Sequence, residues 1–574
     1  MDAALPRKLL LAIALIQGFL LLILHQSIEF RFWPHQEPQW LFCLYSMVII
    51  GPWMLLLSLE SDNWRTIIHW VLPFTLLCGL TGYYVGSQVI PLEHLRFTGS
   101  LVAFVSTLGI ASFKLLMYAQ QRATGNPFNY ADLFRFSWRN FLTLGLALLF
   151  MLCVWGILNL WAELFKVIKI DFFDDLFKEP WFYYPALSLA HGFGVLIFRS
   201  QYKVIDTITR IQQALMKFLL VILTLVSILF LVTLPFTGLD PLWETNSGSA
   251  LILCMQALML FFLNAVYQDD PDTRPYPLVI HRFIYLGIAL LPIYSAIAFY
   301  GLSLRVQQYG WTVDRCWGFL VWGFLALFSV GYLWGIIKQR DAWLHRLSWV
   351  NVRMGILLLC TMILINSPLV DFRKISVNSQ LAQLESGKVK PEDFDIHYFR
   401  RDLMKPGYEA LQKLKQDFNE SHPAVTIAID SLYRDHTNKK NPIDRDQLFK
   451  AIRVLPEHTI PTALADAIYA DLISNPWRLR NIKDYYLMPV DLDEDGSNDY
   501  VLVDITEHFP NVSLFTQQGD VWEKLTLSRL DKQKYDAKKL IDTLQQQTIK
   551  TVTPRWKHLQ LGDFTLQVNQ EAVQ

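Results

Sequence analysis

Residues 141–161 read FLTLGLALLFMLCVWGILNLW and contain no charged side chain. A helix needs about 20 mostly apolar residues to cross roughly 30 Å of hydrocarbon, so this stretch has the length and composition of a membrane span. The chain as a whole shares the bias, because 53% of its 574 residues are hydrophobic, more than an ordinary soluble protein of this size carries. The sequence therefore predicts an α-helical polytopic membrane protein.

Ten further stretches meet the same criterion, which gives eleven predicted transmembrane helices in all. Their cores are residues 9–24, 40–59, 66–85, 98–118, 141–161, 181–198, 218–235, 250–267, 279–300, 316–337 and 350–370. All 6 cysteines lie in or at the ends of these segments. A disulfide framework or a cysteine zinc site in the C-terminal part is therefore excluded.

The loops between the spans differ in their basic residues, which resist translocation. Alternate loops hold fifteen basic residues in one set and seven in the other, the latter being Arg31, Arg96, Lys166, Lys169, Lys178, Arg305 and Arg315. This asymmetry predicts a cytoplasmic N-terminus. With an odd number of spans, everything after Val370 then emerges on the opposite, extracytoplasmic side.

The composition changes abruptly near Asp371, where the chain becomes charged and rich in proline. We expect a transmembrane helical domain over residues 1–370 and a soluble α+β domain over residues 371–574. In the second domain, helical patterns are predicted at 391–403, 408–418, 443–454, 461–472 and 532–547, and strand-like patterns at 484–504, 511–527 and 556–568.

Three stretches resemble a family of bacterial multi-pass membrane proteins known as domain of unknown function 4153. They are Ala14–Leu20, Leu304–Thr312 followed by Arg315, and Ile375–Gln380 followed by Phe394-Asp395 and Tyr398-Phe399-Arg400. The resemblance implies the topology of a bacterial multi-pass membrane protein and no established activity. In a bacterial inner membrane, the extracytoplasmic side that the loop charges predict for the second domain is the periplasm. The chain departs from the family's glycine-rich turn at Met404–Pro406, which puts the geometry of that turn in doubt.

The sharpest local motif is the acidic loop Asp491-Leu492-Asp493-Glu494-Asp495-Gly496-Ser497-Asn498-Asp499. Alternating carboxylates around a glycine turn are typical of calcium loops, and we expect structural Ca²⁺ on Asp491, Asp493, Asp495 and Asp499. The loop is not an EF-hand, because its twelfth position is Leu502 rather than glutamate. The alternative is an acidic hairpin turn with solvated aspartates.

Polar residues inside the spans are candidates for ligand contacts because their burial in hydrocarbon is costly. His191 lies midway along the sixth span beside Gly192 and Gly194, and Gln256 and Asn264 lie in the eighth. The alternative for His191 is a neutral ring that hydrogen-bonds a neighbouring helix. No predicted span has a carboxylate near its midpoint, which weakens a proton-coupled transporter.

The loop between the ninth and tenth spans carries Arg305, Tyr309, Trp311 and Arg315. Two guanidiniums beside two aromatic rings can hold a phosphate or a lipid headgroup. The alternative is an interfacial belt turn around Gly310.

Motifs for soluble chemistry are absent from the sequence, which has no P-loop, no His-Glu-x-x-His helix and no Gly-x-Ser-x-Gly elbow. Nucleic acid is excluded as a partner because 51 basic and 51 acidic side chains balance. Three functions stay open. The first is an envelope-associated binding or sensing protein with a protein partner, the second a transporter of a small or lipid-like substrate, and the third a transferase acting on a lipid-linked substrate. The transporter hypothesis uses Gly51-Pro52, Pro73 with Gly79, and Pro292 as breaks in the helices.

Overall fold

The computed structural model describes residues 5–91, 98–244, 247–267, 275–340, 344–433, 445–475, 478, 482–506, 510–519, 521–527, 536–546, 559–561 and 564–566. The chain divides into two compact units. The first holds residues 1–380 together with 402–405, and the second holds residues 381–401 and 406–574. Each is considered by itself.

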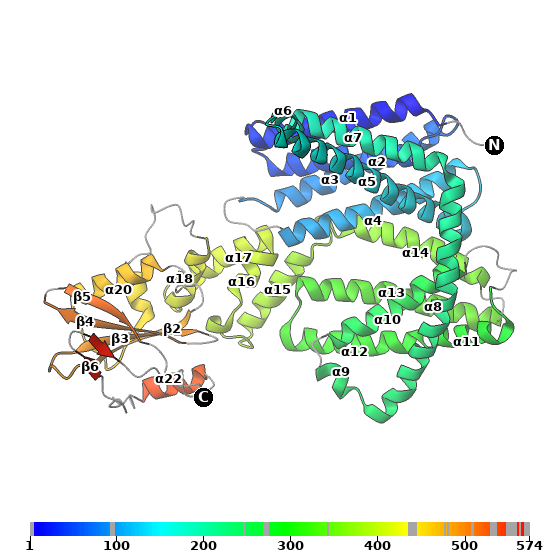
Figure 1. Cartoon of the computed structure of the whole chain (residues 1–574). Helices are drawn as coiled ribbons and strands as arrows, with labels where there is room; N and C mark the ends of the chain where they lie inside the picture. The colour runs from blue at the N-terminus through cyan, green and yellow to red at the C-terminus, as the bar shows by residue number, and fades with distance from the viewer. Residues whose placement is uncertain are drawn as a thin grey trace. The chain divides into compact units, whose positions relative to one another are not determined.

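Eleven helices of the first unit are long and apolar enough to cross a membrane, and they coincide with the eleven predicted spans. Most of them lie side by side (Figure 1). The helices from the N-terminus to residue 385, with the short α6 and α9 and the later α15 that are not spans, and with α11 and α12 together forming one span, are α1 (Arg7–Glu29), α2 (Pro38–Ser58), α3 (Trp64–Ser87), α4 (Thr98–Ala123), α5 (Tyr130–Val167), α6 (Phe172–Lys178), α7 (Pro180–Ser200), α8 (Tyr202–Thr237), α9 (Asp240–Glu244), α10 (Gly248–Val266), α11 (Leu278–Ala289), α12 (Leu291–Tyr309), α13 (Val313–Gln339), α14 (Leu344–Leu364) and α15 (Phe372–Glu385). The prediction of a polytopic helical membrane protein is confirmed.

Close packing of the spans depends on small residues, as is usual where lipid replaces water. A Cβ on Gly82 of α3 would lie 2.7 Å from the carbonyl oxygen of Phe42 on α2. A Cβ on Gly192 of α7 would lie 2.5 Å from the Cβ of Ala14 on α1. Neighbouring helices, rather than a ligand, therefore occupy the space that these glycines leave open.

Prolines break the spans less than the transporter hypothesis requires. Helices α2 and α3 continue through Pro52 and Pro73. The ninth span is divided at Leu290, where α11 ends and α12 begins with Pro292 in its first turn. One of the three expected breaks is therefore present.

The second unit is built on a five-stranded sheet in the order β1-β2-β3-β4-β5. Strand β1 pairs parallel with β2 and the other pairs are antiparallel, with Leu487 opposite Leu502 and Phe515 opposite Lys524. The elements are η2 (Pro391–Asp393), α16 (Ile396–Asp402), α17 (Met404–Asp417), α18 (Pro423–Tyr433), α19 (Arg445–Ala451), β1 (Ile452–Val454), α20 (Thr462–Ser474), β2 (Ile482–Val490), β3 (Asp499–Thr506), β4 (Asn511–Gln518), β5 (Val521–Thr526), α22 (Ala537–Gln545), β6 (Leu559–Leu561) and β7 (Phe564–Leu566). The predicted α+β fold is confirmed for this unit.

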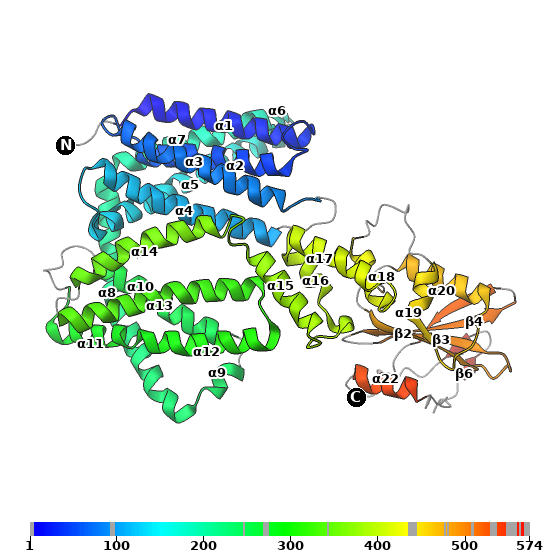
Figure 2. The ribbon, with the colours of Figure 1, turned by 180° about the vertical axis from the view of Figure 1, so that it is seen from behind.

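Both faces of the sheet are covered (Figure 2). Tyr485 and Leu487 face helices α18 and α20, whose Ile427 and Ile468 pack against them. Alternate residues of β2 face the other way, toward Leu544 of α22. The sequence patterns did not predict α18, whose β-branched run at Val425 to Ile429 does not favour helix outside a packed context.

Candidate functional site

The side chain of Arg315 stabilises the loop between α12 and α13. Helix α12 ends at Gly310, which has φ +69°, and Thr312 caps α13 by accepting the amide of Arg315 at 3.4 Å. Nη1 of Arg315 donates to the carbonyl oxygens of Tyr309 at 3.1 Å and Gly310 at 2.6 Å, and the guanidinium lies 5.4 Å from the Tyr309 ring. The structure thus brings Tyr309, Trp311 and Arg315 together, and part of the hydrogen-bonding capacity of Arg315 closes the turn.

Helix α15 binds the same loop. The amide of Trp311 donates to Oγ of Ser379 at 2.9 Å, and the Trp311 carbonyl accepts from Oγ of Ser376 at 3.2 Å. Nε2 of Gln380 donates to the carbonyls of Tyr309 at 2.9 Å and Trp311 at 3.0 Å. Two of the stretches that carried the family resemblance, 304–312 and 375–380, are therefore in direct contact.

A buried ion pair stands at the start of α15. Asp371 is 5% exposed, and its carboxylate accepts from Nε and Nη2 of Arg373, each at 2.8 Å. The hydroxyl of Tyr84, at the end of α3, donates to the same carboxylate at 2.7 Å. Burial raises the pKa of Asp371, but the hydrogen bonds and charge of Arg373 and the bond from Tyr84 outweigh it, so that the pKa lies below its usual value.

Residues 402–405 return to this region from the second unit's sequence. Met404 is 1% exposed, its Sδ lies 2.9 Å from Nη1 of Arg373, and the amide of Lys405 donates to the carbonyl of Gln88 at 3.1 Å. Met404 has φ +50°, a conformation that glycine adopts without strain. The turn at Met404–Pro406 therefore contains a left-handed residue that is not glycine.

We call the assembly of Tyr84, Trp311, Asp371, Arg373, Gln380 and Met404 the clasp. Its polar atoms are used in contacts within the first unit. That arrangement is suited to holding the chain that leaves the last span, rather than to bond-breaking chemistry. The sequence patterns did not predict a role for Tyr84, Asp371 or Arg373, although an acid and a base two residues apart directly after a span are a usable signal.

His191 lies on α7, half-buried, and its Nε2 is enclosed without a hydrogen-bond partner among the described residues. The expected bond to a neighbouring helix is therefore not made through this nitrogen.

Gln256 is fully buried on α10. Its Nε2 lies 2.6 Å from Oγ of both Ser295 on α12 and Ser329 on α13, and 3.5 Å from the carbonyl of Leu291 at the break in the ninth span. Its contacts thus join α10, α12 and α13 and reach the break in the ninth span.

A second buried polar group joins four helices near Asn264. Oδ1 of Asn264 accepts from the hydroxyl of Tyr332 at 2.9 Å and from Nδ2 of Asn351 at 2.6 Å, and its carbonyl accepts from the hydroxyl of Tyr130 at 3.0 Å. The same Tyr332 hydroxyl also lies against Oδ1 of Asn351. Such interhelical bonds are typical of membrane bundles, and the sequence identified Asn264 without its partners.

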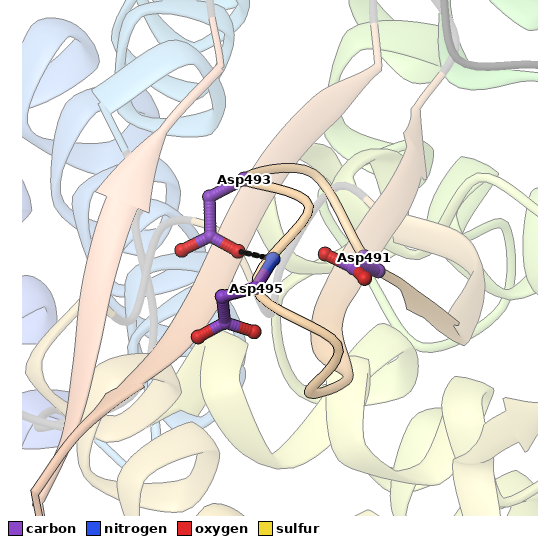
Figure 3. A group of neighbouring side chains, drawn as sticks. All are labelled: Asp491, Asp493 and Asp495. Carbon is purple, nitrogen blue, oxygen red and sulfur yellow. Dashed lines mark hydrogen bonds between the residues drawn. The ribbon is translucent and has the colours of Figure 1, made fainter.

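The acidic loop connects β2 to β3 and is shown in Figure 3. Carboxylate oxygens of Asp491, Asp493 and Asp495 lie within 4.8 Å of one another. Asp493 accepts the amide of Asp495 at 3.3 Å, and Asp491 accepts the amide of Gly496, which has φ +86°, at 3.1 Å. Asp499 lies outside this group, 4% exposed, and accepts the amide of Leu492 at 3.3 Å. Three of the four expected ligands are thus brought together.

Two of the cavities in the described part of the first unit are large enough to hold a small molecule. The larger, about 570 Å³, is lined by α2 and α4, including Tyr45, Trp53, Phe104 and Leu108. The other, about 490 Å³, is lined by α8, by Ile293 of α12, and by Leu239 and Leu290, which lie just outside these helices. Both have apolar walls, and neither is lined by His191, Gln256 or Arg305.

Comparison with known proteins adds one match. The profile of the family described as domain of unknown function (DUF4153) matches residues 9–414. No curated protein and no solved structure matches the chain. The matched range includes the clasp and stops before the acidic loop. Because it covers more than half of the 574 residues, the chain belongs to the family described as domain of unknown function (DUF4153).

Proposed function

We propose that this chain is an envelope-associated binding or sensing protein of the bacterial inner membrane. Its second unit lies on the periplasmic side and meets a protein or ionic partner, and the helical unit anchors it in the bilayer. The observation that supports this function best is the clasp.

An anchor needs only a flexible tether, for which polar, glycine-rich or serine-rich sequence suffices. Here the chain leaves the last span through α15, which hydrogen-bonds the α12–α13 loop. The ion pair between Asp371 and Arg373 at the start of α15 is hydrogen-bonded to Tyr84 of α3. A tether so fixed gives a signal from the second unit a physical route into the spans, because packed elements shift between discrete arrangements rather than deforming continuously.

The orientation is tested with reporter fusions. Alkaline phosphatase fused after Gln574 is expected to be active, because the enzyme folds only outside the cytoplasm, and a cytoplasmic reporter at the same place is expected to be silent. A fusion after Asp62, between α2 and α3, is the matched control and should behave in the opposite way. Silent phosphatase at Gln574 with an active cytoplasmic reporter would overturn the proposed orientation.

Calcium is the partner that we propose for the second unit, through Asp491, Asp493 and Asp495. Support comes from the convergence of their carboxylates and from the millimolar affinities at which extracellular calcium modules work. Calorimetry of the full chain in detergent should give heat with millimolar Ca²⁺. An Asp493→Asn/Asp495→Asn variant should give none, and a silent wild-type chain would remove calcium from the proposal.

Transmission is tested separately by hydrogen exchange in the clasp. If the second unit signals, millimolar Ca²⁺ should change the exchange of peptides covering 304–312 and 372–380 in the full chain, and the Asp493→Asn/Asp495→Asn variant should show no change. Heat of binding without any change in these peptides would leave a calcium site but refute transmission through the clasp.

The break at Leu290 is the one observation that favours a transporter as a second candidate, since broken helices often line substrate sites. The contact of Gln256 with the carbonyl of Leu291 places a ligand-type side chain there. Transport would be supported if the reconstituted chain takes up a substrate and Gln256→Leu abolishes that uptake without unfolding the protein. The transferase alternative has no such observation in its favour.

A further inference from the structure

Helix α8 is much longer than a membrane span requires. It has 36 residues, about 54 Å at 1.5 Å per residue, whereas about 20 residues cross the hydrocarbon. Its C-terminal part, from residue 218, is the predicted span. Residues 202–217 are left over, and we call them the α8 extension.

Helix α8 runs across the direction of the other long helices, and the α8 extension lies along the end of the bundle at which α7 finishes (Figures 1 and 2). It packs little against the protein. Ile205, 1% exposed, is its one buried side chain among residues 203–217. A helix with this orientation and so little burial needs another surface for its apolar residues.

The exposed apolar residues of the α8 extension form a stripe that continues onto Phe218, the first residue of the predicted span. Val204, Ile211, Leu215 and Phe218 are 50%, 59%, 60% and 68% exposed. Their spacing of seven, four and three residues places them on one face of the helix. This stripe is not the face that carries Ile205, which lies about a hundred degrees further round the helix.

The cations of the α8 extension lie along the other edge of the stripe. Lys203, Arg210 and Lys217 are spaced seven residues apart, close to two helical turns. None of the three forms an ion pair with the part of the chain that the structure describes. Apolar residues beside a row of cations are the pattern of helices that lie in the headgroup region of a bilayer.

We propose that the α8 extension is an interfacial helix that binds anionic phospholipid. The apolar stripe enters the acyl region, and Lys203, Arg210 and Lys217 contact the headgroup phosphates. The eleven spans place the protein in a bilayer, so lipid is available beside the α8 extension. The positive charge of the three cations favours anionic over zwitterionic lipid. The proposal does not depend on the sensing function, because it concerns only the first unit and its lipids.

A photocrosslinker in the stripe tests this on the full chain. With p-benzoylphenylalanine in place of Leu215, the protein is reconstituted in vesicles of equal phosphatidylcholine and phosphatidylglycerol, irradiated and analysed by mass. We expect lipid adducts enriched in phosphatidylglycerol by about fivefold or more, since each cation near an anionic surface strengthens attraction by about that factor. The same probe at Val330, 58% exposed on α13, should show no such enrichment.

The charge is tested with Lys203→Gln/Arg210→Gln/Lys217→Gln, which should remove the enrichment. Lys388→Gln/Lys390→Gln/Lys413→Gln, which removes three exposed cations of the second unit, should leave it unchanged. Should the triple variant fold poorly, raising the salt concentration on the wild-type background weakens the enrichment without any charge substitution. Enrichment equal to that at Val330, or crosslinking to a second copy of the chain instead of lipid, would overturn the proposal.

Discussion

Replacing Tyr84 with phenylalanine is the sharpest test of the clasp. The substitution removes a 2.7 Å hydrogen bond to the carboxylate of Asp371, which is 5% exposed. A hydrogen bond to a charged group contributes about 1.5–3 kcal/mol. This corresponds to roughly a 10- to 150-fold change in the equilibrium for local opening of the clasp.

Hydrogen exchange of the α15 amides in the reconstituted full chain measures that opening. Protection of residues 375–380 should fall by the same factor in Tyr84→Phe. Tyr83→Phe is the matched control, because Tyr83 is the preceding residue, is 38% exposed and contacts Trp40 through its ring. Equal protection in the two variants would refute the assignment of Tyr84 to the clasp.

The contribution of Asp371 also predicts a pH dependence. Its folded-state pKa is depressed below the usual value, so the stabilisation is fully present above the ordinary carboxyl pKa near ~4. It is lost as the pH falls below that value, through the depressed pKa, because the protonated acid no longer pairs with Arg373. The difference between wild type and Tyr84→Phe should therefore be constant at neutral pH and shrink in strong acid. A difference that shrinks between neutral pH and about pH 5 would point to another group.

Two further substitutions test the buried polar groups. Asp504 is fully buried and lies 2.6 Å from Nε of Arg478, so Arg478→Met leaves this carboxylate without its main partner. The free energy of unfolding of the second unit should fall by about 3–5 kcal/mol, which limited proteolysis detects as faster cleavage. Arg453→Met is the control and should change little, because that arginine is 55% exposed in its ion pair. Burial keeps the pKa of Asp504 raised despite Arg478. The loss of stability in Arg478→Met should therefore diminish as the pH falls, because the carboxyl becomes neutral. A loss of stability that does not depend on pH would mean that packing, and not charge, is responsible. Gln256→Leu should lower the thermal midpoint in detergent by the equivalent of about 0.6–1.7 kcal/mol for each hydrogen bond to serine that is lost. The control is Asn159→Leu, because the Asn159 amide is exposed and bonds within its own helix. Equal midpoints for the two variants would show that Gln256 does not stabilise the packing of its neighbouring helices.

The sequence by itself determined the number and position of the spans, because continuous apolar stretches have no alternative to helix in lipid. It also predicted that a charged α+β region follows the last span, although β3 is buried along its whole length and so does not show the alternation of a half-buried strand. The loop 304–315 and the stretch 375–380 were identified as landmarks, and their contact was beyond prediction.

Only the tertiary structure decided which polar groups meet. The bond from Tyr84 to Asp371 joins residues 287 positions apart, and no local pattern encodes such a pairing. The same holds for Gln256, whose serine partners lie on two other helices. Helix α8 is a third case, because the sequence predicted a short span from residue 218, and only the structure shows one continuous helix of 36 residues that begins at Tyr202. Hydrophobic length is a property of the chain, whereas contacts between distant side chains depend on how the helices pack.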